Sequence, residues 1–324
     1  MTHFILVPDN LNQAGLDILD AVQDFEVYAP GKMNRADTLA QVPNAHAMII
    51  RSGTTVDADL LQKADNLKIV VRAGVGVDNV DLDTCTARGI VVMNTPDANT
   101  VSTAEMALAL ILALARHIPQ ADRSLREGRW DRKAYVGMEL DGKTLGIIGF
   151  GRVGRALAQR AKCLGLHEIA YDPFVPEDVA RHLGLSLVPR LDELLEAADI
   201  ISLHAVVTDD TRELIDAAAI TKMKDGVMII NAARGALVNN ADLAAALNSG
   251  KVAGAAVDVY DVEPPPPNNP LLGLPNVIHT PHLGASTREA QDVVGVQAAE
   301  AVVNALIKKR FNNVRNRAVL EKLT

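Results

Sequence analysis

Three side chains that could move a proton or bind an anion each follow a predicted strand. His282 follows the apolar stretch 277–280, Glu263 follows 253–258, and Arg234 follows 227–231. An imidazole can take a proton from a hydroxyl, a neighbouring carboxylate stabilises its charged form, and a guanidinium can bind a carboxylate through two hydrogen bonds. These three residues are therefore the candidate catalytic set. His204 also ends a strand and is the alternative base, but no acid is held beside it in the sequence.

A second candidate site is the G-x-G-x-x-G spacing of Gly149, Gly151 and Gly154. It lies between a predicted buried strand, 144–148, and a helix-patterned segment, which is the context in which such glycines bind a diphosphate at a helix N-terminus. A second strand, 167–171, ends in Asp172, eighteen residues beyond Gly154. A carboxylate there suits the ribose hydroxyls of the cofactor and repels a 2′-phosphate, so the predicted cofactor is NAD rather than NADP.

The elements that must position these residues alternate between strand and helix. The first hundred residues contain short apolar strands, each followed by a predicted helix, at 4–7, 25–28, 47–50, 68–71 and 90–93. A long helix follows, for which Ser102-Thr103-Ala104-Glu105 fits a capping box, and it continues through Arg116. From Gly142 a second series of strands begins, predicted at 144–148, 167–171, 200–204, 227–231, 253–258 and 277–280. Such alternation predicts parallel sheets covered by helices.

After Pro281 the pattern returns to a helix at 287–309, which we expect to complete the first domain. The predicted fold is α/β, with two doubly wound parallel sheets. A Rossmann-type NAD-binding domain of residues 99–285 is inserted in a flavodoxin-like substrate-binding domain of residues 1–98 and 286–324. Substrate is expected in the cleft between them. The proline run 264–267 can form neither helix nor central strand and is predicted to be a rigid loop.

Two loops of the first domain are candidates for binding the substrate. Ala73-Gly74-Val75-Gly76-Val77 could present successive N–H groups to a carboxylate, and Arg51-Ser52-Gly53 adds a cation and a hydroxyl suited to a phosphate or a second carboxylate. The alternatives are a plain turn and an arginine at the sheet rim, and the sequence does not decide between them.

The bulk composition excludes several classes of protein. The 324 residues carry a net charge of −8 without dense basic clusters, which argues against nucleic-acid binding. The longest apolar run, 106–115, is shorter than the roughly 18 residues needed to span a membrane. It predicts a helix that is buried either in the core of one subunit or at an interface, and the second alternative makes self-association an expectation. No secretory signal is visible, so a soluble cytoplasmic protein is expected. Cys85 and Cys163 have no metal-site spacing and are predicted to be buried, reduced thiols, and no metal is expected.

Longer strings resemble one family. The chain is similar to the D-isomer-specific 2-hydroxyacid dehydrogenases nearly end to end. The matching segments are 72–81 (RAGVGVDNVD), 94–96 (NTP), 149–154 (GFGRVG), 171–173 (YDP), 231–235 (NAARG), 258–265 (DVYDVEPP) and 281–287 (PHLGAST). The resemblance is greatest to the members that oxidise D-3-phosphoglycerate to 3-phosphohydroxypyruvate in serine biosynthesis. It implies hydride transfer between C2 of a phosphorylated 2-hydroxy acid and NAD, in a homodimer.

The resemblance also assigns roles residue by residue. Arg234, Glu263 and His282 take the catalytic roles. The implied cofactor contacts are Val75, Gly149, Gly151, Arg152, Val153, Gly154, Asp172, Ala205, Ala232, Ala233, Asp258, Gly284 and Ala285. The implied substrate contacts are Arg51, Ser52, Gly74, Val75, Gly76 and Asn99. The basic segment 130–133 (WDRK) is similar to one that reaches the substrate phosphate from a neighbouring subunit in the phosphoglycerate enzymes.

Two departures from the family pattern change what is expected. Where that family has His-Thr-Pro or His-Val-Pro, this chain has His204-Ala205-Val206, which removes a hydroxyl and a proline near the cofactor and puts nicotinamide-side affinity in question. The sequence ends at Thr324, which leaves no room for the regulatory domain of many phosphoglycerate enzymes, so serine feedback through it is not expected.

Three other functions remain open at this point. A glyoxylate or hydroxypyruvate reductase would use the same chemistry with one carboxylate anchor and no phosphate site. An NAD-sensing corepressor would bind the cofactor without turnover. A structural interaction protein with a vestigial cleft would not depend on His282.

Overall fold

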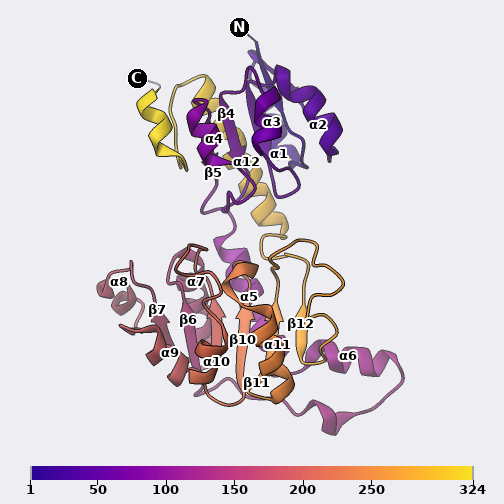
Figure 1. The fold of residues 1–324 in the computed structure, drawn as a ribbon, viewed down its shortest axis with the longest axis vertical. Helices are drawn as coiled ribbons and strands as arrows, with labels where there is room; N and C mark the ends of the chain where they lie inside the picture. Colours follow the sequence, from indigo (N-terminus) through magenta and orange to yellow (C-terminus); the bar gives the residue numbers. More distant parts are fainter. Residues whose placement is uncertain (1, 323–324) are drawn as a thin grey trace. The chain divides into compact units, whose positions relative to one another are not determined.

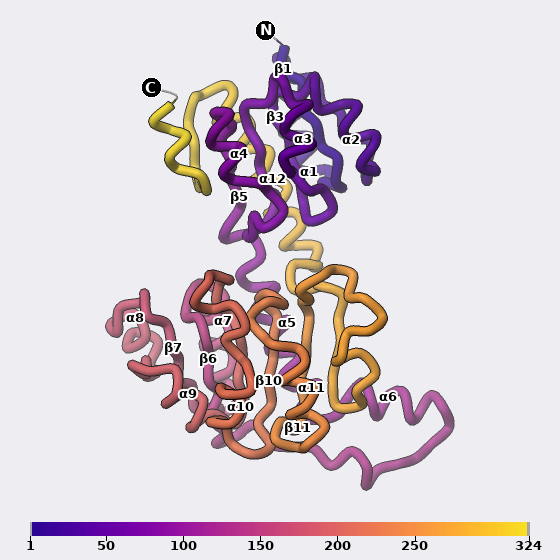
Figure 2. The backbone as a smooth tube through the Cα atoms, viewed as in Figure 1, coloured from indigo at the N-terminus to yellow at the C-terminus, as the bar shows by residue number. Residues whose placement is uncertain are grey.

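The computed structural model describes residues 2–322 of the chain. The chain divides into two compact units. Unit 1 runs up to Asn99 and resumes at Ser286, and unit 2 comprises Thr100–Ala285. Figure 2 follows the backbone as it leaves unit 1 at the end of the indigo-to-purple segment and returns to it in the yellow segment. The chain therefore passes between the units twice.

Unit 1 is built on a five-stranded parallel sheet of order β2-β1-β3-β4-β5, one of the two common doubly wound orders. Its strands are β1 (His3–Leu6), β2 (Phe25–Tyr28), β3 (Ala47–Ile50), β4 (Ile69–Arg72) and β5 (Val91–Asn94). Its helices are α1 (Gln13–Asp20), α2 (Arg35–Gln41), α3 (Ala58–Lys63), α4 (Leu82–Ala87) and α12 (Arg288–Leu306), with 3-10 turns η1 (Val42–Asn44) and η5 (Arg317–Lys322).

Both faces of this sheet are covered, because successive strand residues point to opposite sides. Ile5 and Ile49 pack with α1 and α12 residues such as Leu19 and Val302. On the other face Leu6, Met48 and Ile50 pack with α3 and α4 residues such as Leu60, Leu61 and Cys85. The short apolar runs seen in the sequence are thus strands buried on two sides.

Unit 2 contains a seven-stranded parallel sheet of order β12-β11-β10-β9-β6-β7-β8. Its strands are β6 (Thr144–Ile148), β7 (His167–Tyr171), β8 (Ser186–Leu187), β9 (Ile200–Leu203), β10 (Val227–Asn231), β11 (Val252–Val257) and β12 (Val277–His279). Its helices are α5 (Thr100–Ala115), α6 (Ile118–Arg126), α7 (Arg152–Ala161), α8 (Glu177–His182), α9 (Leu191–Ala197), α10 (Ala217–Lys222) and α11 (Asn240–Ser249), with 3-10 turns η2 (Arg132–Tyr135), η3 (Lys162–Leu164) and η4 (Gly235–Leu237).

The strand order places the first strand, β6, beside the fourth, β9, so the direction of the sheet's connections changes between them. Helices α5 and α7 contribute Ile111 and Leu157 to the core on one face, and α9 and α11 contribute Leu194 and Leu243 to the core on the other (Figure 1). The prediction of an α/β protein with two doubly wound parallel sheets is confirmed.

Two expectations from the sequence were wrong. Helix α5 begins at Thr100, so Ser102 and Thr103 lie buried inside it and form no capping box. The thiol of Cys163 is exposed, because η3 turns it away from the core, whereas Cys85 is buried and its pKa rises to about 12 through burial. Strand β8 was not predicted, since two residues carry no periodicity.

Within the described residues, no single helix is long and apolar enough to cross a membrane. The bent pair Thr100–Ala115 and Ile118–Arg126 passes that test together, on length and composition only.

Candidate functional site

Three loops at the carboxyl ends of β10, β11 and β12 bring the predicted catalytic residues together. These strands are adjacent and parallel, so their carboxyl ends lie at one edge of the sheet. The loop after β10 passes very close to the loop after β11: a Cβ on Gly235 would lie 2.1 Å from the Tyr260 carbonyl carbon and 2.3 Å from the Asp261 nitrogen. Glycine at 235 therefore permits the approach that brings Arg234 towards Glu263.

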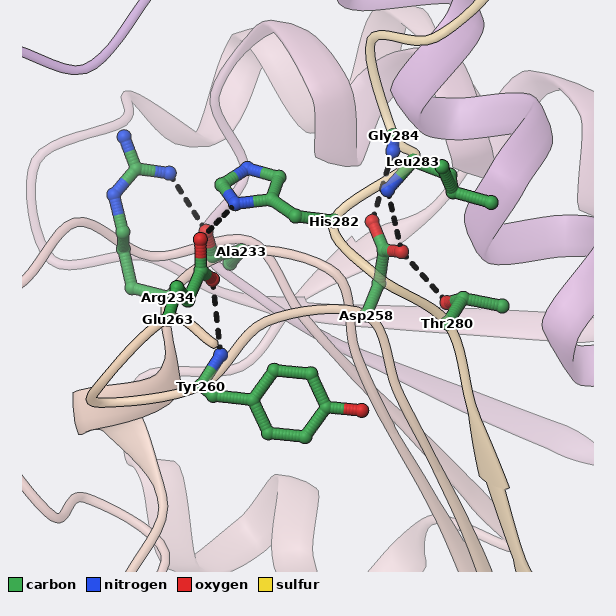
Figure 3. A network of polar contacts seen from close by, with 9 residues as sticks. All are labelled: Ala233, Arg234, Asp258, Tyr260, Glu263, Thr280, His282, Leu283 and Gly284. Atoms are coloured by element: carbon green, nitrogen blue, oxygen red, sulfur yellow. Dashed lines mark hydrogen bonds and ion pairs between the residues drawn. The ribbon is translucent and has the colours of Figure 1, made fainter. Parts of the chain in front are cut away.

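The central contact is a hydrogen bond of 2.7 Å between His282 Nδ1 and Glu263 Oε2 (Figure 3). Glu263 Oε1 accepts a second bond from the Tyr260 N–H at 3.1 Å, which fixes the carboxylate plane. With Nδ1 directed at a carboxylate, the Nε2 atom of His282 is the ring nitrogen left to exchange a proton. Both side chains keep more than a third of their surface exposed, so a substrate can reach them.

The charges around Glu263 favour its ionised form. Burial by itself raises the pKa of Glu263, but hydrogen bonds from His282 and the Tyr260 N–H, with the nearby charge of Arg234, outweigh burial and leave the pKa below its ordinary value. Figure 3 shows the guanidinium and the imidazole on either side of this carboxylate. Arg234 is held by its own loop, since its Nη1 donates to the Ala233 carbonyl and its carbonyl accepts from Asn231 Nδ2.

Asp258 organises the loop that carries His282. Its carboxylate, fully buried at 0% exposure, accepts hydrogen bonds from Thr280 Oγ1 (2.6 Å), the Leu283 N–H (2.7 Å) and the Gly284 N–H (2.8 Å) (Figure 3). The Asp258 carbonyl also accepts from the His282 N–H at 2.8 Å. These bonds surround His282 and hold its backbone at φ +55°. This left-handed conformation is costly for residues other than glycine.

The opposite side of this loop is held by α5. Ser102 Oγ donates to the Gly284 carbonyl at 2.7 Å, and Thr103 Oγ1 lies 3.3 Å from the same oxygen. Nothing in the sequence indicated this contact, since Ser102 and Gly284 are far apart along the chain and a hydroxyl inside a helix more often bonds its own helix.

The glycine loop after β6 has the geometry expected of a diphosphate site. Gly149 (φ +93°) passes so close to the loop after β9 that a Cβ would lie 2.5 Å from the Ala205 nitrogen, and a Cβ on Gly154 would lie 2.3 Å from the Gly149 carbonyl oxygen. Gly151, by contrast, faces open space, and it precedes α7 without a side-chain cap. No side chain caps the start of α7, so this helix N-terminus is suited to an anion.

Asp172, at the end of β7, binds the adjoining backbone on both sides. Its Oδ2 accepts from the Phe150 N–H at 2.8 Å and its Oδ1 from the Phe174 N–H at 2.9 Å. The carboxylate is therefore fixed beside the glycine loop, and each oxygen retains a lone pair for a ligand hydroxyl.

The other predicted cofactor contacts fall in both units. Arg152 and Val153 begin α7, Ala205 follows β9, Ala232 and Ala233 follow β10, and Gly284 and Ala285 follow His282, all in unit 2. Val75 lies in unit 1. The alternative base is His204, whose Nε2 shares a hydrogen bond of 2.9 Å with Ser202 Oγ. Burial lowers the pKa of His204 to about 4, so its ring is neutral near pH 7.

In unit 1 hydrogen bonds to the backbone hold the two candidate substrate loops in place. Asp9 Oδ2 accepts from the Arg51 N–H at 2.6 Å, while Asn79 Nδ2 donates to the Arg51 and Thr54 carbonyls at 2.7 and 2.6 Å. This clamp fixes the backbone on which Arg51 and Ser52 stand. Neither Asp9 nor Asn79 was singled out from the sequence, because an isolated Asp or Asn carries no periodic signal.

The second loop, 73–77, turns its carbonyls towards β5. The Gly74 carbonyl accepts from the Thr95 N–H, and the Val75 carbonyl accepts from Asn94 Nδ2. Gly74 has φ +144°, a backbone conformation that strains any residue with a side chain. At the end of the first segment of unit 1, the Oδ1 atom of Asn99 is buried without a hydrogen-bond partner within residues 2–322. The same residues contain no cluster of three or more His, Cys, Asp or Glu side chains that could hold a metal.

Comparison with known proteins supplies the family. Residues 108–284 match the model of the D-isomer specific 2-hydroxyacid dehydrogenase, NAD binding domain. The chain belongs to this family. The matched residues lie within unit 2 and form an NAD-binding domain.

Individual relatives agree with this assignment. The chain is 51% identical over 300 residues to D-3-phosphoglycerate dehydrogenase of Archaeoglobus fulgidus, an alignment that covers 93% of this chain and 56% of that protein. A solved structure from Thermus thermophilus superposes with TM-score 0.87 at 35% identity, covering 96% of this chain and 99% of that one. The NADPH-dependent glyoxylate/hydroxypyruvate reductase of Sinorhizobium meliloti superposes with TM-score 0.85 at 30% identity, with 98% of both chains covered. The chain spans little more than half the length of the curated relatives it matches.

Proposed function

We propose that this chain catalyses the NAD-dependent oxidation of D-3-phosphoglycerate to 3-phosphohydroxypyruvate. The observation that carries the proposal is the His282–Glu263 bond of 2.7 Å with Arg234 alongside, on three neighbouring strand ends of the NAD-binding domain. The similarity to D-3-phosphoglycerate dehydrogenases along 93% of the chain supports the choice of substrate.

The proton is handled by the imidazole. His282 donates its Nδ1 hydrogen to Glu263 and uses Nε2 to accept the proton of the C2 hydroxyl. The imidazolium so formed is stabilised by the ionised Glu263 carboxylate. Arg234 binds the substrate carboxylate and polarises the C2 oxygen as it becomes a carbonyl. In the reverse direction His282 returns the proton to that oxygen.

The residues present fit a bound NAD. Gly151 opens onto space at the uncapped start of α7, where the diphosphate would be held by N–H groups, and the fixed Asp172 carboxylate would accept from the adenine ribose hydroxyls. Bound NAD supplies the acceptor for the hydride that leaves C2. The carboxylate of Asp172 would repel a 2′-phosphate, which supports NAD over NADP. Ala205 in place of the threonine or valine usual in the family supports weaker binding on the nicotinamide side.

The substrate anchors lie on the loops of unit 1. The N–H groups of 74–76 would bind the substrate carboxylate, and Arg51 with Ser52, on the backbone clamped by Asp9 and Asn79, would bind the phosphate.

Initial rates with two substrates test this proposal against the reductase alternative. With NAD, the chain should oxidise D-3-phosphoglycerate, and with NADH it should reduce 3-phosphohydroxypyruvate at a higher kcat/KM than glyoxylate. Arg51→Gln should raise the KM for the phosphorylated substrate and leave that for glyoxylate nearly unchanged. A preference for glyoxylate would overturn the choice of substrate while leaving the catalytic residues in place.

We also propose that the chain forms a homodimer through unit 2. Large apolar side chains are exposed along α5, α6 and the segment after it, among them Val101, Leu112, Ile118, Leu125 and Trp130. Such a surface favours burial against a second copy. Sedimentation velocity of the parent and of Leu125→Glu tests this: the parent should sediment as a dimer and the variant as a monomer. The basic segment 130–133 would then be available to a neighbouring active site.

A further inference from the structure

Unit 1 contains a cavity at the amino-terminal ends of its strands, which is the sheet edge opposite to the candidate substrate loops. Its volume is about 630 Å³, within the range of roughly 300–1,000 Å³ typical of small-molecule sites. The residues that line it are Lys68, Ile69, Gly89, Val91, Ala305, Leu306, Lys309, Phe311 and Leu320. None of them belongs to the catalytic, cofactor or substrate sets described above.

The cavity has a fixed frame. Ile69 and Val91 begin β4 and β5, and Leu306 ends α12. The segment that carries Phe311 and Leu320 is tied to the edge of β5, because Asn316 is buried there, accepts from the Val92 N–H and donates to the Ile90 carbonyl. A mainly apolar hollow, open to solvent on one side, thus remains between the sheet and the last helical turns.

The charge at the rim is positive. Lys68 and Lys309 are exposed at the cavity, and Lys309 Nζ donates to the Leu306 carbonyl at 2.9 Å. The rings of His3 and His46 lie 5.4 Å apart, and burial lowers the pKa of both. The charge of Lys68 lowers both pKa values further, and the charge of Lys309 also lowers that of His3. Two cations therefore line one cavity on a chain whose net charge is −8.

We propose that this cavity binds an amphipathic carboxylate, of the class of a medium-chain free fatty acid. The acyl tail would lie among Ile69, Val91, Leu306, Phe311 and Leu320, and the carboxylate would lie between Lys68 and Lys309. An apolar lining alone would suit a neutral ligand, and two lysines alone would suit any anion. The combination selects a molecule that has both parts.

The test is calorimetric titration of the full-length chain with decanoate, and with three probes that each lack one feature: decanol, butyrate and decylamine. Decanoate should bind, and butyrate, decanol and decylamine should each bind more weakly. Octanoate should bind about tenfold more weakly than decanoate, because two buried methylenes are lost.

Substitutions identify the place of binding. Lys68→Gln and Lys309→Gln should each weaken decanoate binding about threefold, the size expected of an exposed ion pair, and leave decanol binding unchanged. The matched control is Lys308→Gln, which removes a neighbouring charge that does not line the cavity and should have no effect. Leu320→Ser should weaken decanoate and decanol alike. Thermal melts confirm that each variant is folded.

Several results would overturn the proposal. The first is that decanoate gives no heat of binding, and the second is that decanol binds as tightly as decanoate. The third is that the Lys68, Lys309 and Lys308 variants bind decanoate with equal affinity. Because the assay needs neither NAD nor substrate, its outcome is independent of the proposed dehydrogenase activity.

Discussion

Removing the Asp258 carboxylate should destabilise the NAD-binding domain and displace His282. The buried carboxylate accepts from Thr280 Oγ1 and from the N–H groups of Leu283 and Gly284. In Asp258→Ala both N–H groups lose their partner, and at about 2 kcal/mol for the buried Gly284 N–H and about 1 kcal/mol for the partly buried Leu283 N–H the loss of stability is about 3 kcal/mol. In Asp258→Asn one oxygen is kept and an amide NH₂ faces one donor, so about 2 kcal/mol is expected.

The consequence for catalysis follows from the strained backbone of His282. Without the bonds that hold φ at +55°, the imidazole should leave its position near Glu263, and misplacement by about 1 Å can cost about 100-fold in kcat. Urea unfolding followed by circular dichroism measures the stability, and initial rates with NAD and D-3-phosphoglycerate measure kcat.

A matched control separates the two effects. Asp199 in the same unit also bonds a backbone N–H, that of Thr144 at 2.8 Å, but lies in the turn before β9 and away from the His282 loop. Asp199→Asn should therefore lower the stability and leave kcat close to that of the parent. An Asp258→Asn variant whose free energy of unfolding lies within about 0.5 kcal/mol of the parent's, with unchanged kcat, would contradict this role of Asp258.

Four further outcomes are expected. Glu263→Gln should lower kcat about 100-fold with little change in melting temperature, because the carboxylate that stabilises the imidazolium is lost; an unchanged kcat would contradict the role. The lowered pKa of Glu263 means that its ionised form contributes stability above the unfolded value of about 4.3, which is lost as the pH falls through the folded value. Between pH 6 and pH 3 the melting temperature should therefore fall more steeply with decreasing pH for the parent than for Glu263→Gln. Gly235→Ala should cost about 1–3 kcal/mol and reduce kcat, since its Cβ would overlap the Tyr260 backbone, and urea titration beside rate measurement checks both. Asp172→Ser should raise kcat/KM for NADP relative to NAD at least about tenfold, and an unaltered ratio would show that another group selects the cofactor.

Much of the NAD-binding domain could be predicted because its signals are local. A glycine loop between an apolar strand and a helix, followed by an acid at the end of the next strand, requires only neighbouring residues to be recognised. The candidate catalytic residues could also be predicted, since each stands directly after a strand, and parallel strands bring their carboxyl ends to one edge. The start of α5 was harder to predict from the sequence. Ser102 is of a residue type that often caps a helix, yet the helix begins two residues earlier, at Thr100.

Composition and spacing alone determined the α/β class, the doubly wound sheets and the residue types of the site. Only the tertiary structure decided how those residues are held. The Asp258 network, the Ser102 bond to Gly284, the Asp9 and Asn79 clamp and the close approach at Gly235 all join residues of different elements. The physical reason is that periodicity records which face of an element is buried, whereas a buried polar group finds its partner through the packing of whole elements. A single sequence carries no record of those partners.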